Sequence, residues 1–360
     1  MISESDTRVE AALEAMKRGQ MVVVIDDHDR EGEGDIIAAA STITPEQMAF
    51  IVRHTSGIVC APITGERAQK LRLDPMVASN DSAHTTAFTV TIDFKHGTTT
   101  GISAEDRTAT VRALTNGNVA AEDFSRPGHI FPLIARRGGV LMRSGHTEAA
   151  VDLCRLADLP DVGVICELVN DDGTVTRGQQ VADFAAAHDL PLISVADLIA
   201  YRQRREKLVE RVATFEIDTA AGRAIAYAYS TPFDRVQHLA LVFGDVGQGV
   251  PVNVRLQRED IVTDVFGSAE KLNASIAALA ETGGVLVYLR EGNAGVAYDR
   301  AAAEAEREDH GSARDRDAEW REVGLGAQIL RDLGISAIKP MSSRSRRYVG
   351  LEAFGITISD

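Results

Sequence analysis

The chain has 360 residues, of which 44% are hydrophobic and 25% are charged, a composition typical of a globular protein of about two domains and not of a disordered chain or a coiled coil. Its 53 acidic residues outnumber its 38 basic ones and give a formal net charge of −15, so we expect small-molecule or protein partners and no nucleic acid. No stretch reaches the roughly 18 uncharged apolar residues that a membrane span needs. The N-terminal residues also lack the apolar run of a secretory signal, and we expect no membrane partner.

Three cysteines occur in the sequence, Cys60, Cys154 and Cys166. A small, odd number of cysteines excludes a disulfide scaffold and predicts a reducing, cytoplasmic location. Because none follows Cys166, the second half of the chain cannot build a cysteine-rich zinc site.

Short strands alternate with helices up to residue 201. Thr44, Pro45 and Gln47 supply an N-cap, a proline at the first helical position and a glutamine at the third, which predicts a helix start. Strands are predicted at residues 21–25, 58–61, 87–92, 130–134 and 162–169, and another strand is predicted to begin at residue 36. Further helices are predicted at residues 9–16, from 103 with a capping box, and at 146–156 and 179–188. This pattern indicates a layered α/β sandwich with a mixed sheet over residues 1–202.

A polar, basic stretch at 202–208 predicts a connection to a second, smaller α/β domain over residues 208–360. Strands are expected there at residues 236–242, 251–256 and 284–289, and a helix at 324–333. Residues 301–321 are dense in charges of both signs, which is typical of a solvated helix or loop.

Six carboxylates crowd the segment that follows the first predicted strand: Asp26, Asp27, Asp29, Glu31, Glu33 and Asp35. Their mutual repulsion must be offset if the segment is ordered, and a divalent cation with oxygen ligands would do so. The spacing does not fit an EF-hand and is more typical of a Mg²⁺ or Mn²⁺ site with open positions. An exposed acidic loop is the alternative from this segment alone.

Residues 143–147, Arg-Ser-Gly-His-Thr, precede a predicted helix and combine a guanidinium, two hydroxyls, a glycine and helical amides. This combination favours a phosphate or polyol cradle. His146 is either a metal ligand that completes the acidic site or an incidental residue at the helix start.

Two further ionisable residues stand out. His129 follows a turn and is a candidate general acid or base because its side chain titrates near neutrality. Glu167 lies inside an apolar run, where a carboxylate is rare without a partner. Cys60 is interpreted as a small buried hydrophobe.

Taken together, these segments resemble 3,4-dihydroxy-2-butanone 4-phosphate synthase, an enzyme of riboflavin biosynthesis. The resemblance covers nearly all of residues 8–201. The matching segments are DDHDREGEGD (26–35), RHTSGIVC (53–60), FTVTID (88–93), TTGISAEDRTATVRAL (99–114), RPGHIFPL (126–133), GGVLMRSGHTEAAVDL (138–153) and GVICELVNDDG (163–173). His28 and Gly32 depart from the family's usual Glu and Asn, and neither is a ligand position in the family's pattern.

The resemblance implies ribulose 5-phosphate as substrate, formate and a four-carbon phosphate as products, and Mg²⁺ or Mn²⁺ as cofactor. It implies Glu31 and His146 as metal ligands, and His129 and Glu167 as catalytic residues. The substrate contacts that it implies are Arg30, Glu31, Asp35, Arg143, Ser144, Gly145, His146, Thr147 and Glu167. It also implies a homodimer with active sites close to the subunit interface.

The remainder of the chain resembles GTP cyclohydrolase II, on traces that include DVFGS (264–268) and GLGAQIL (324–330). Where that family has three zinc-binding cysteines, this chain has Asp260, Lys271 and Asn273, so we expect no zinc and no GTP cyclohydrolase activity. The resemblance also places Glu319 and Arg321 where that family has its catalytic Asp and Arg, Val323 where it has a Tyr, and residues 342–344 (Ser-Ser-Arg) where it has a Thr-Asn-Asn segment near the nucleotide. The alternatives are a bifunctional enzyme and a catalytically silent regulatory protein.

Overall fold

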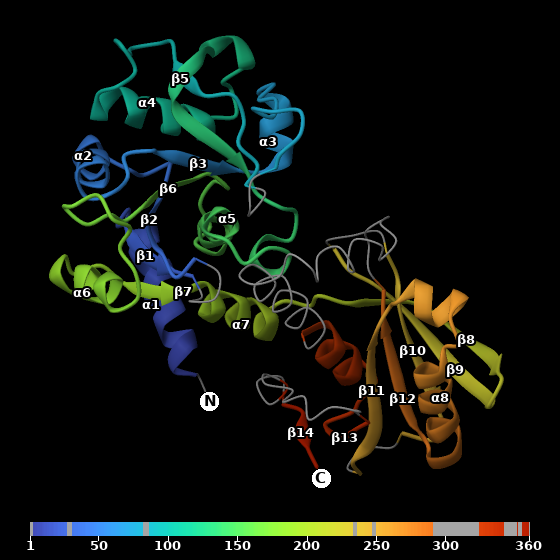
Figure 1. Ribbon diagram of the computed structural model, residues 1–360. Helices are drawn as coiled ribbons and strands as arrows, with labels where there is room; N and C mark the ends of the chain where they lie inside the picture. The colour runs from blue at the N-terminus through green and yellow to red at the C-terminus, as the bar shows by residue number, and fades with distance from the viewer. Residues whose placement is uncertain are drawn as a thin grey trace. The chain divides into compact units, whose positions relative to one another are not determined.

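The structure is a computed structural model that describes residues 3–26, 31–81, 86–232, 236–246, 250–290, 324–341, 351 and 355–359. The chain divides into two compact units, Met1–Tyr201 and Arg202–Asp360, and each is described by itself (Figure 1). None of the described helices has the length and apolar character needed to cross a membrane.

The N-terminal unit is built on a seven-stranded sheet with the order β4-β5-β3-β6-β2-β1-β7. The pairs β1–β7 and β3–β5 are parallel and the others antiparallel, so the predicted mixed sheet is confirmed. The strands are β1 (Val22–Ile25), β2 (Gly34–Ala39), β3 (Cys60–Ile63), β4 (Ile92–Phe94), β5 (Phe124–Ile134), β6 (Gly163–Glu167) and β7 (Leu192–Ser194).

Helices cover both faces of this sheet. They are α1 (Glu4–Lys17), α2 (Pro45–His54), α3 (Gly65–Lys70), α4 (Ala104–Thr115), α5 (His146–Leu156), α6 (Gln179–Ala187) and α7 (Val195–Arg205), with 3₁₀ turns η1 (Ala121–Asp123) and η2 (Gly139–Leu141). The capping box predicted for α2 is present: the Thr44 side chain accepts from Gln47 N, and the Gln47 side chain accepts from Thr44 N.

One face of the sheet buries the main core, in which Val23, Ile36 and Val164 pack with apolar residues of α2, α4 and α6. Side chains alternate between faces along a strand, so the neighbours of these residues point to the opposite face. That opposite face lies against α5, which packs on β2, β3 and β6. The candidate site described below lies on the α5 side.

The structure departs from the predictions in several places of this unit. The strand expected at 130–134 begins at Phe124, so the turn predicted before His129 is part of β5, and α3, β7 and α7 were not predicted. The strand expected at 87–92 is reduced to β4, because residues 88 and 89 form only isolated bridges with Leu133 and Pro75. The basic stretch at 202–208 is not wholly a linker, since α7 continues to Arg205. At the start of α4, Asp106 N donates to Ser103 Oγ as expected, but the Asp106 carboxylate turns away to residues 99 and 101.

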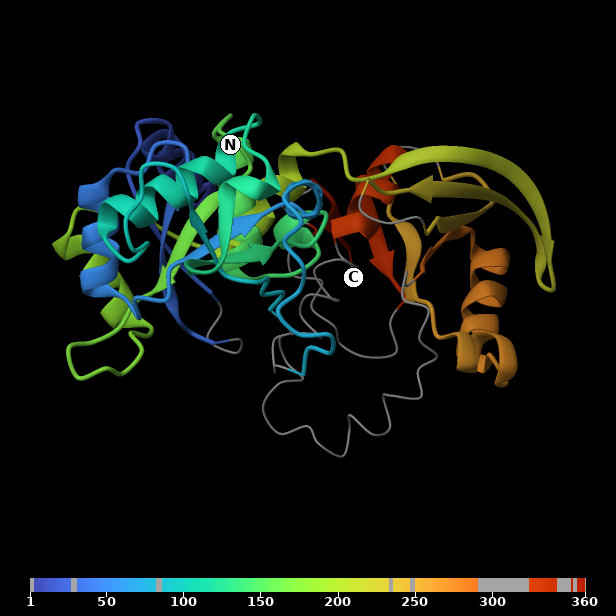
Figure 2. The same cartoon turned by 90° about the horizontal axis from the view of Figure 1, so that it is seen from above.

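The C-terminal unit holds a second seven-stranded sheet, ordered β14-β13-β11-β12-β10-β9-β8. Its strands are β8 (Glu210–Thr219), β9 (Gly222–Ser230), β10 (His238–Phe243), β11 (Val252–Arg258), β12 (Gly284–Leu289), β13 (Ala337–Pro340) and β14 (Thr357–Ile358). Figure 2 shows α8 (Glu270–Thr282), in orange, along one face of this sheet, where Leu279 packs on Phe243 and Leu286. A π-helical turn, η3 (Val262–Phe266), precedes α8, and a helix spans residues 324–332.

The three strands predicted in this unit match β10, β11 and β12 to within two residues. The hairpin β8–β9 was missed, although Ala213, Phe215 and Ile217 alternate with polar residues along β8, a strand that is exposed along nearly all its length. The charged stretch 301–321 lies outside the described residues.

Candidate active site

The acidic segment joins β1 to β2 as a hairpin. Asp26 N donates to Glu33 O at 3.1 Å, and Glu33 N donates to Asp26 Oδ1 at 2.9 Å. The pairing of β1 with β2 then places Asp35 opposite Val24, with only 2% of Asp35 exposed. Residues 27–30, including the predicted substrate contact Arg30, lie outside the described residues.

Asp26, Glu31 and His146 come together beside this hairpin. One potential ligand atom from each lies within 4.8 Å of the others. His146 is the first residue of α5 and is buried, so the helix carries it onto the end of β1 and β2. Two carboxylates and an imidazole are a donor set that fits Mg²⁺ or Mn²⁺. The structure therefore brings Glu31 and His146 together and adds Asp26, which the sequence offered only as one of six loop carboxylates.

Neighbouring groups hold His146 in place. Its Nε2 lies 3.1 Å from Val24 O and can donate to that carbonyl, which leaves Nδ1, 3.4 Å from Asp35 Oδ1, as the nitrogen with a lone pair for a metal ion. Contacts of this kind fix the orientation of a metal-binding imidazole.

A cation offsets part of the carboxylate repulsion in the hairpin. Burial raises the pKa of Glu33, and nearby Glu31 and Asp26 raise it further, while the ion pair with Arg177 lowers it. Arg177 Nη2 lies 2.5 Å from Glu33 Oε1, and the two residues also form an isolated antiparallel bridge. Because 144 residues separate Arg177 from Glu33, no local pattern in the sequence indicated this ion pair.

Glu167 ends β6 directly beside the hairpin, since it pairs with Asp35 across β2 and β6. Ser56 fixes it from the other side: Ser56 Oγ donates to Glu167 Oε2 at 2.9 Å, and Ser56 N donates to Glu167 O at 2.8 Å. The carboxylate that looked isolated in an apolar run thus has a partner and lies at the edge of the acidic site.

His129 lies at the same end of the sheet as Glu167. Cys60 on β3 pairs with Ile165 on one side and with Phe131 on the other. Glu167 is two residues beyond Ile165 and His129 two residues before Phe131, so both point to the same face of the sheet. Two strand spacings separate them, roughly 10 Å at the backbone.

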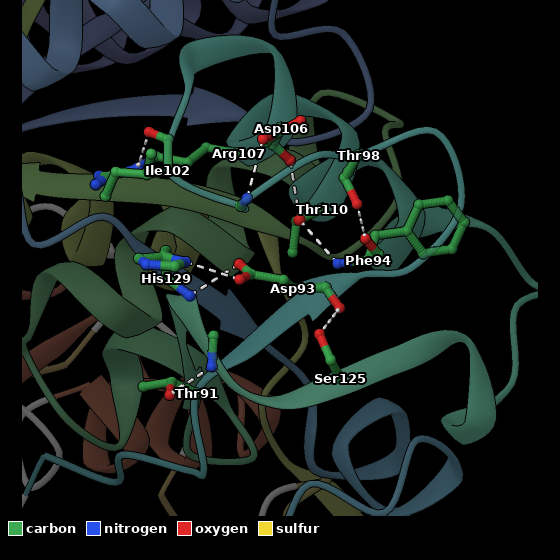
Figure 3. Close-up of polar contacts among 12 residues, drawn as sticks. Thr91, Asp93, Phe94, Thr98, Ile102, Asp106, Arg107, Thr110, Ser125 and His129 are labelled. Atoms are coloured by element: carbon green, nitrogen blue, oxygen red, sulfur yellow. Dashed lines mark hydrogen bonds and ion pairs between the residues drawn. The ribbon is translucent and has the colours of Figure 1, made fainter.

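The His129 imidazole is held by Asp93 of β4 (Figure 3). Asp93 Oδ2 lies 2.7 Å from His129 Nδ1, and Asp93 Oδ1 accepts from His129 N at 2.8 Å. Because a carboxylate only accepts hydrogen bonds, Nδ1 carries a proton and Nε2 is the basic nitrogen of the neutral ring. Sequence reasoning missed Asp93, although its position within the matched FTVTID segment was a signal.

Residues 143–147 form the turn into α5. Arg143 Nη1 donates to Glu148 Oε2 at 2.7 Å, and its Nη2 donates to Thr86 Oγ1 at 3.1 Å. Glu148 is 1% exposed and also accepts from Arg136 N at 2.9 Å. Gly145 is the N-cap residue, and a Cβ on it would lie 2.4 Å from Arg143 Nη1. Ser144 and Thr147 are buried beside it, so the five predicted residues share one compact turn.

The Cys60 thiol is buried on β3. Burial, and secondarily Glu167, raises its pKa well above the ordinary value, so the thiol stays protonated. The interpretation of Cys60 as a small buried hydrophobe agrees with this environment.

The fold and the site define a class: a two-unit α/β enzyme whose first unit gathers a carboxylate–histidine donor set and two further titratable side chains, His129 and Glu167, at one end of a mixed sheet. The family model described as 3,4-dihydroxy-2-butanone 4-phosphate synthase matches residues 10–201. The chain belongs to this family, and its first unit is a lyase domain of riboflavin biosynthesis.

Proteins similar along the whole chain carry both units. A second family model, GTP cyclohydrolase II, matches residues 210–360. The bifunctional riboflavin biosynthesis protein RIBA 1, chloroplastic, of Arabidopsis thaliana is 46% identical, over 96% of this chain and 67% of its own length. The riboflavin biosynthesis protein RibBA of Bacillus mycoides is 43% identical, over 98% of this chain and 92% of its own.

Two solved structures are also similar. RibBX, a two-domain 3,4-dihydroxy-2-butanone 4-phosphate synthase from A. baumannii, superposes with a TM-score of 0.83 at 36% identity and covers 98% of this chain and 99% of its own. A 3,4-dihydroxy-2-butanone 4-phosphate synthase in complex with two magnesium ions has a TM-score of 0.53 at 44% identity and covers 55% of this chain and 97% of its own.

The structure describes the three positions of the second unit that correspond to the zinc-binding cysteines of the GTP cyclohydrolase II family. Asp260 accepts from Thr263 through both carboxylate oxygens, at 3.0 and 3.3 Å, and Lys271 and Asn273 lie in the first turn of α8. Within residues 202–360 that the structure describes, no three His, Cys, Asp or Glu side chains converge as they do at His146. Glu319, Arg321, Val323 and the segment 342–344 lie outside the described residues.

Proposed function

We propose that the first unit converts ribulose 5-phosphate to 3,4-dihydroxy-2-butanone 4-phosphate and formate with the help of Mg²⁺ or Mn²⁺. The observation that carries the proposal is the convergence of Asp26, Glu31 and His146 in a chain whose family includes a magnesium-bound structure. A divalent ion bound there would stabilise negative charge that develops on neighbouring substrate oxygens.

The reaction needs protons to be removed and returned at several carbons, so it needs more than one acid/base group. Glu167, oriented by Ser56, is placed to exchange a proton with a substrate held at the acidic hairpin. His129, with Nε2 basic and Nδ1 bound to Asp93, is placed to act as the second group.

The turn at 143–147 binds the substrate, including its phosphate. Arg143 presents a guanidinium that Glu148 and Thr86 hold in one orientation. The N-terminus of α5 adds the positive end of a helix dipole, which favours an anion. Arg30 and Asp35 complete the proposed substrate contacts.

The direct test is to incubate the purified chain with ribulose 5-phosphate and to measure formate with Mg²⁺, with Mn²⁺ and with a chelator. We expect formate with either ion and none with the chelator. Glu167→Gln should abolish turnover, whereas Asp161→Asn, at an exposed ion pair with Arg155, should keep it. No formate with either ion would favour the silent regulatory alternative, and near-normal turnover of Glu167→Gln would remove that residue's role.

We also propose that the second unit lacks GTP cyclohydrolase II activity and has a structural or regulatory role. The support is the donor chemistry at the three compared positions: Lys271 is a cation, Asn273 is a poor zinc ligand, and Asp260 already binds Thr263. The bifunctional alternative is favoured by the Arabidopsis thaliana relative, which is named a bifunctional riboflavin biosynthesis protein. Zinc-dependent formate release from GTP by the purified chain would establish that alternative instead.

A homodimer and a cytoplasmic location belong to the same proposal. The three buried, free cysteines suit a reducing compartment. Sedimentation of the purified chain would measure its oligomeric mass, and a monomer that retains activity would contradict a dimer with sites at its interface.

A further inference from the structure

Arg107, in the first turn of α4, is a buried cation whose partners are all main-chain carbonyls. It is 8% exposed, and it donates through Nε to Ile102 O at 3.1 Å and through Nη1 to Gly57 O at 3.0 Å. No carboxylate of the described residues pairs with it in the structure. Burying a charge without an ion pair is unfavourable, so a contribution to the stability of the fold does not by itself explain why Arg107 is buried here.

One of its two acceptors belongs to the loop that supports His129. The Asp106 carboxylate accepts from Thr99 N, Thr99 Oγ1 and Gly101 N, at 2.7 to 3.0 Å. Gly101 packs so closely on Asp93 that a Cβ would lie 2.0 Å from Asp93 Oδ2. The loop at 99–102 therefore sets the position of the Asp93 carboxylate, whose contacts with His129 are drawn in Figure 3.

The other acceptor belongs to the segment that supports Glu167. Gly57 follows Ser56, whose side chain and main chain both donate to Glu167. The next residue, Ile58, accepts through its carbonyl from Cys166 Sγ at 3.3 Å on β6. A shift of the 56–58 segment would therefore move Ser56 away from Glu167.

We infer that Arg107 is a positioning residue that ties the His129 loop to the Glu167 segment and so keeps the two proposed acid/base groups in register. The inference rests on the roles proposed above for His129 and Glu167. Its physical basis is that one rigid guanidinium bonds both segments at once. Among the described residues, no other hydrogen bond joins residues 99–102 to residues 56–58.

The chain offers a matched control on the same helix. Arg112 also donates to two main-chain carbonyls, at 2.8 Å to Ile43 and at 3.5 Å to Thr42, and neither belongs to a segment that contacts His129 or Glu167. Arg107→Met and Arg112→Met remove the same kind of interaction from one helix. Arg107→Lys keeps the charge but cannot span both carbonyls as a fork, and it serves if Arg107→Met does not fold.

The experiment compares kcat, KM and the pH profile of kcat for ribulose 5-phosphate in these variants. We expect Arg107→Met to lower kcat at least tenfold, to change KM less than threefold and to shift a limb of the pH profile, and Arg107→Lys to recover part of kcat. Arg112→Met should keep kcat within twofold. Equal behaviour of the Arg107 and Arg112 variants would overturn the inference.

A readout without turnover separates this inference from the proposed function. In chain labelled at histidine, the His129 ring signals, assigned with His129→Asn, should shift in Arg107→Met and stay unchanged in Arg112→Met. If the wild-type chain releases no formate but the signals respond, the proposed function fails and the coupling stands. If formate is released and the signals do not respond, the coupling fails alone.

Discussion

The Asp93 carboxylate makes two contacts with His129. One oxygen lies 2.7 Å from the ring Nδ1, and the other accepts from the main-chain N–H of His129 at 2.8 Å. The bond to the main-chain N–H fixes the position of the His129 backbone, and the bond to the ring fixes which ring nitrogen is basic.

Asp93→Asn should therefore impair turnover without unfolding the chain. An amide side chain can donate to Nδ1, which favours the tautomer with its proton on Nε2 and removes the proposed base. We expect kcat to fall tenfold or more, about 1.4 kcal/mol in activation free energy. The matched control is Asp123→Asn, whose carboxylate lies 2.8 Å from the exposed His96, and it should leave kcat unchanged. Equal rates for both variants would contradict a role for the Asp93–His129 pair.

Gly101→Ala tests the Asp93–His129 pair by placing a methyl group against the Asp93 carboxylate. Gly101 has a φ of +88°, and an added Cβ would lie 2.0 Å from Asp93 Oδ2. Gly97 has a φ of +74° with nothing within 4 Å of an added Cβ, so Gly97→Ala carries a backbone cost of about 1 kcal/mol and no clash. We expect both variants to lose stability in urea unfolding, but only Gly101→Ala to lose most of its formate production. Loss of activity in Gly97→Ala as well would attribute the effect to the backbone alone.

Asp26 is predicted to contribute to divalent-ion binding together with Glu31 and His146. Asp26→Asn and Glu31→Gln should each weaken Mn²⁺ binding at least tenfold, about 1.4 kcal/mol, as measured by calorimetry without substrate. Asp172→Asn removes a carboxylate that binds Thr174 in an exposed turn and should bind Mn²⁺ like the unaltered chain. Unchanged affinity in Asp26→Asn would leave Glu31 and His146 as the ligand pair.

We predict that the buried thiols of Cys154 and Cys166 lower the free energy of unfolding at alkaline pH. Burial raises the pKa of Cys154 to about 12 and that of Cys166 to about 11. An unfolded chain ionises its thiols near pH 8.5 to 9, so the contribution is complete below that range and is lost as pH rises toward the folded values. Between pH 8 and 10.5, urea unfolding should show the free energy falling by about 2 kcal/mol per thiol. Cys154→Ala should show a shallower fall, and an identical pH dependence would refute this account.

Local signals in the sequence were sufficient for much of the first unit. The capping box at Thr44 and Gln47 fixed the start of α2, and the apolar spacing of 146–156 matched α5 at both ends. The strand predicted at 87–92 was wrong in its bounds, because residues that look like a strand pair only through isolated bridges. β-propensity reports how well side chains fit a sheet surface and cannot specify which partner is available.

The candidate site was less accessible to sequence reasoning. Neighbouring carboxylates and the turn at 143–147 were visible as local clusters. Asp93 and Arg177 were not, because each acts on a residue 36 or 144 positions away. Contacts of that range depend on strand order, and strand order follows from the packing of the whole sheet rather than from any segment of it.

The helix α5 restricts how this family can vary in length. His146 begins the helix at the proposed metal site, Glu148 accepts from the Arg136 amide, and Asp152 accepts from the Val140 amide at 2.8 Å. One inserted residue between Glu148 and Asp152 would turn the latter by about 100° and detach the preceding loop, although His146 would keep its place. Insertions and deletions should therefore be absent from 146–152 among active relatives and tolerated in the exposed turn at 170–173.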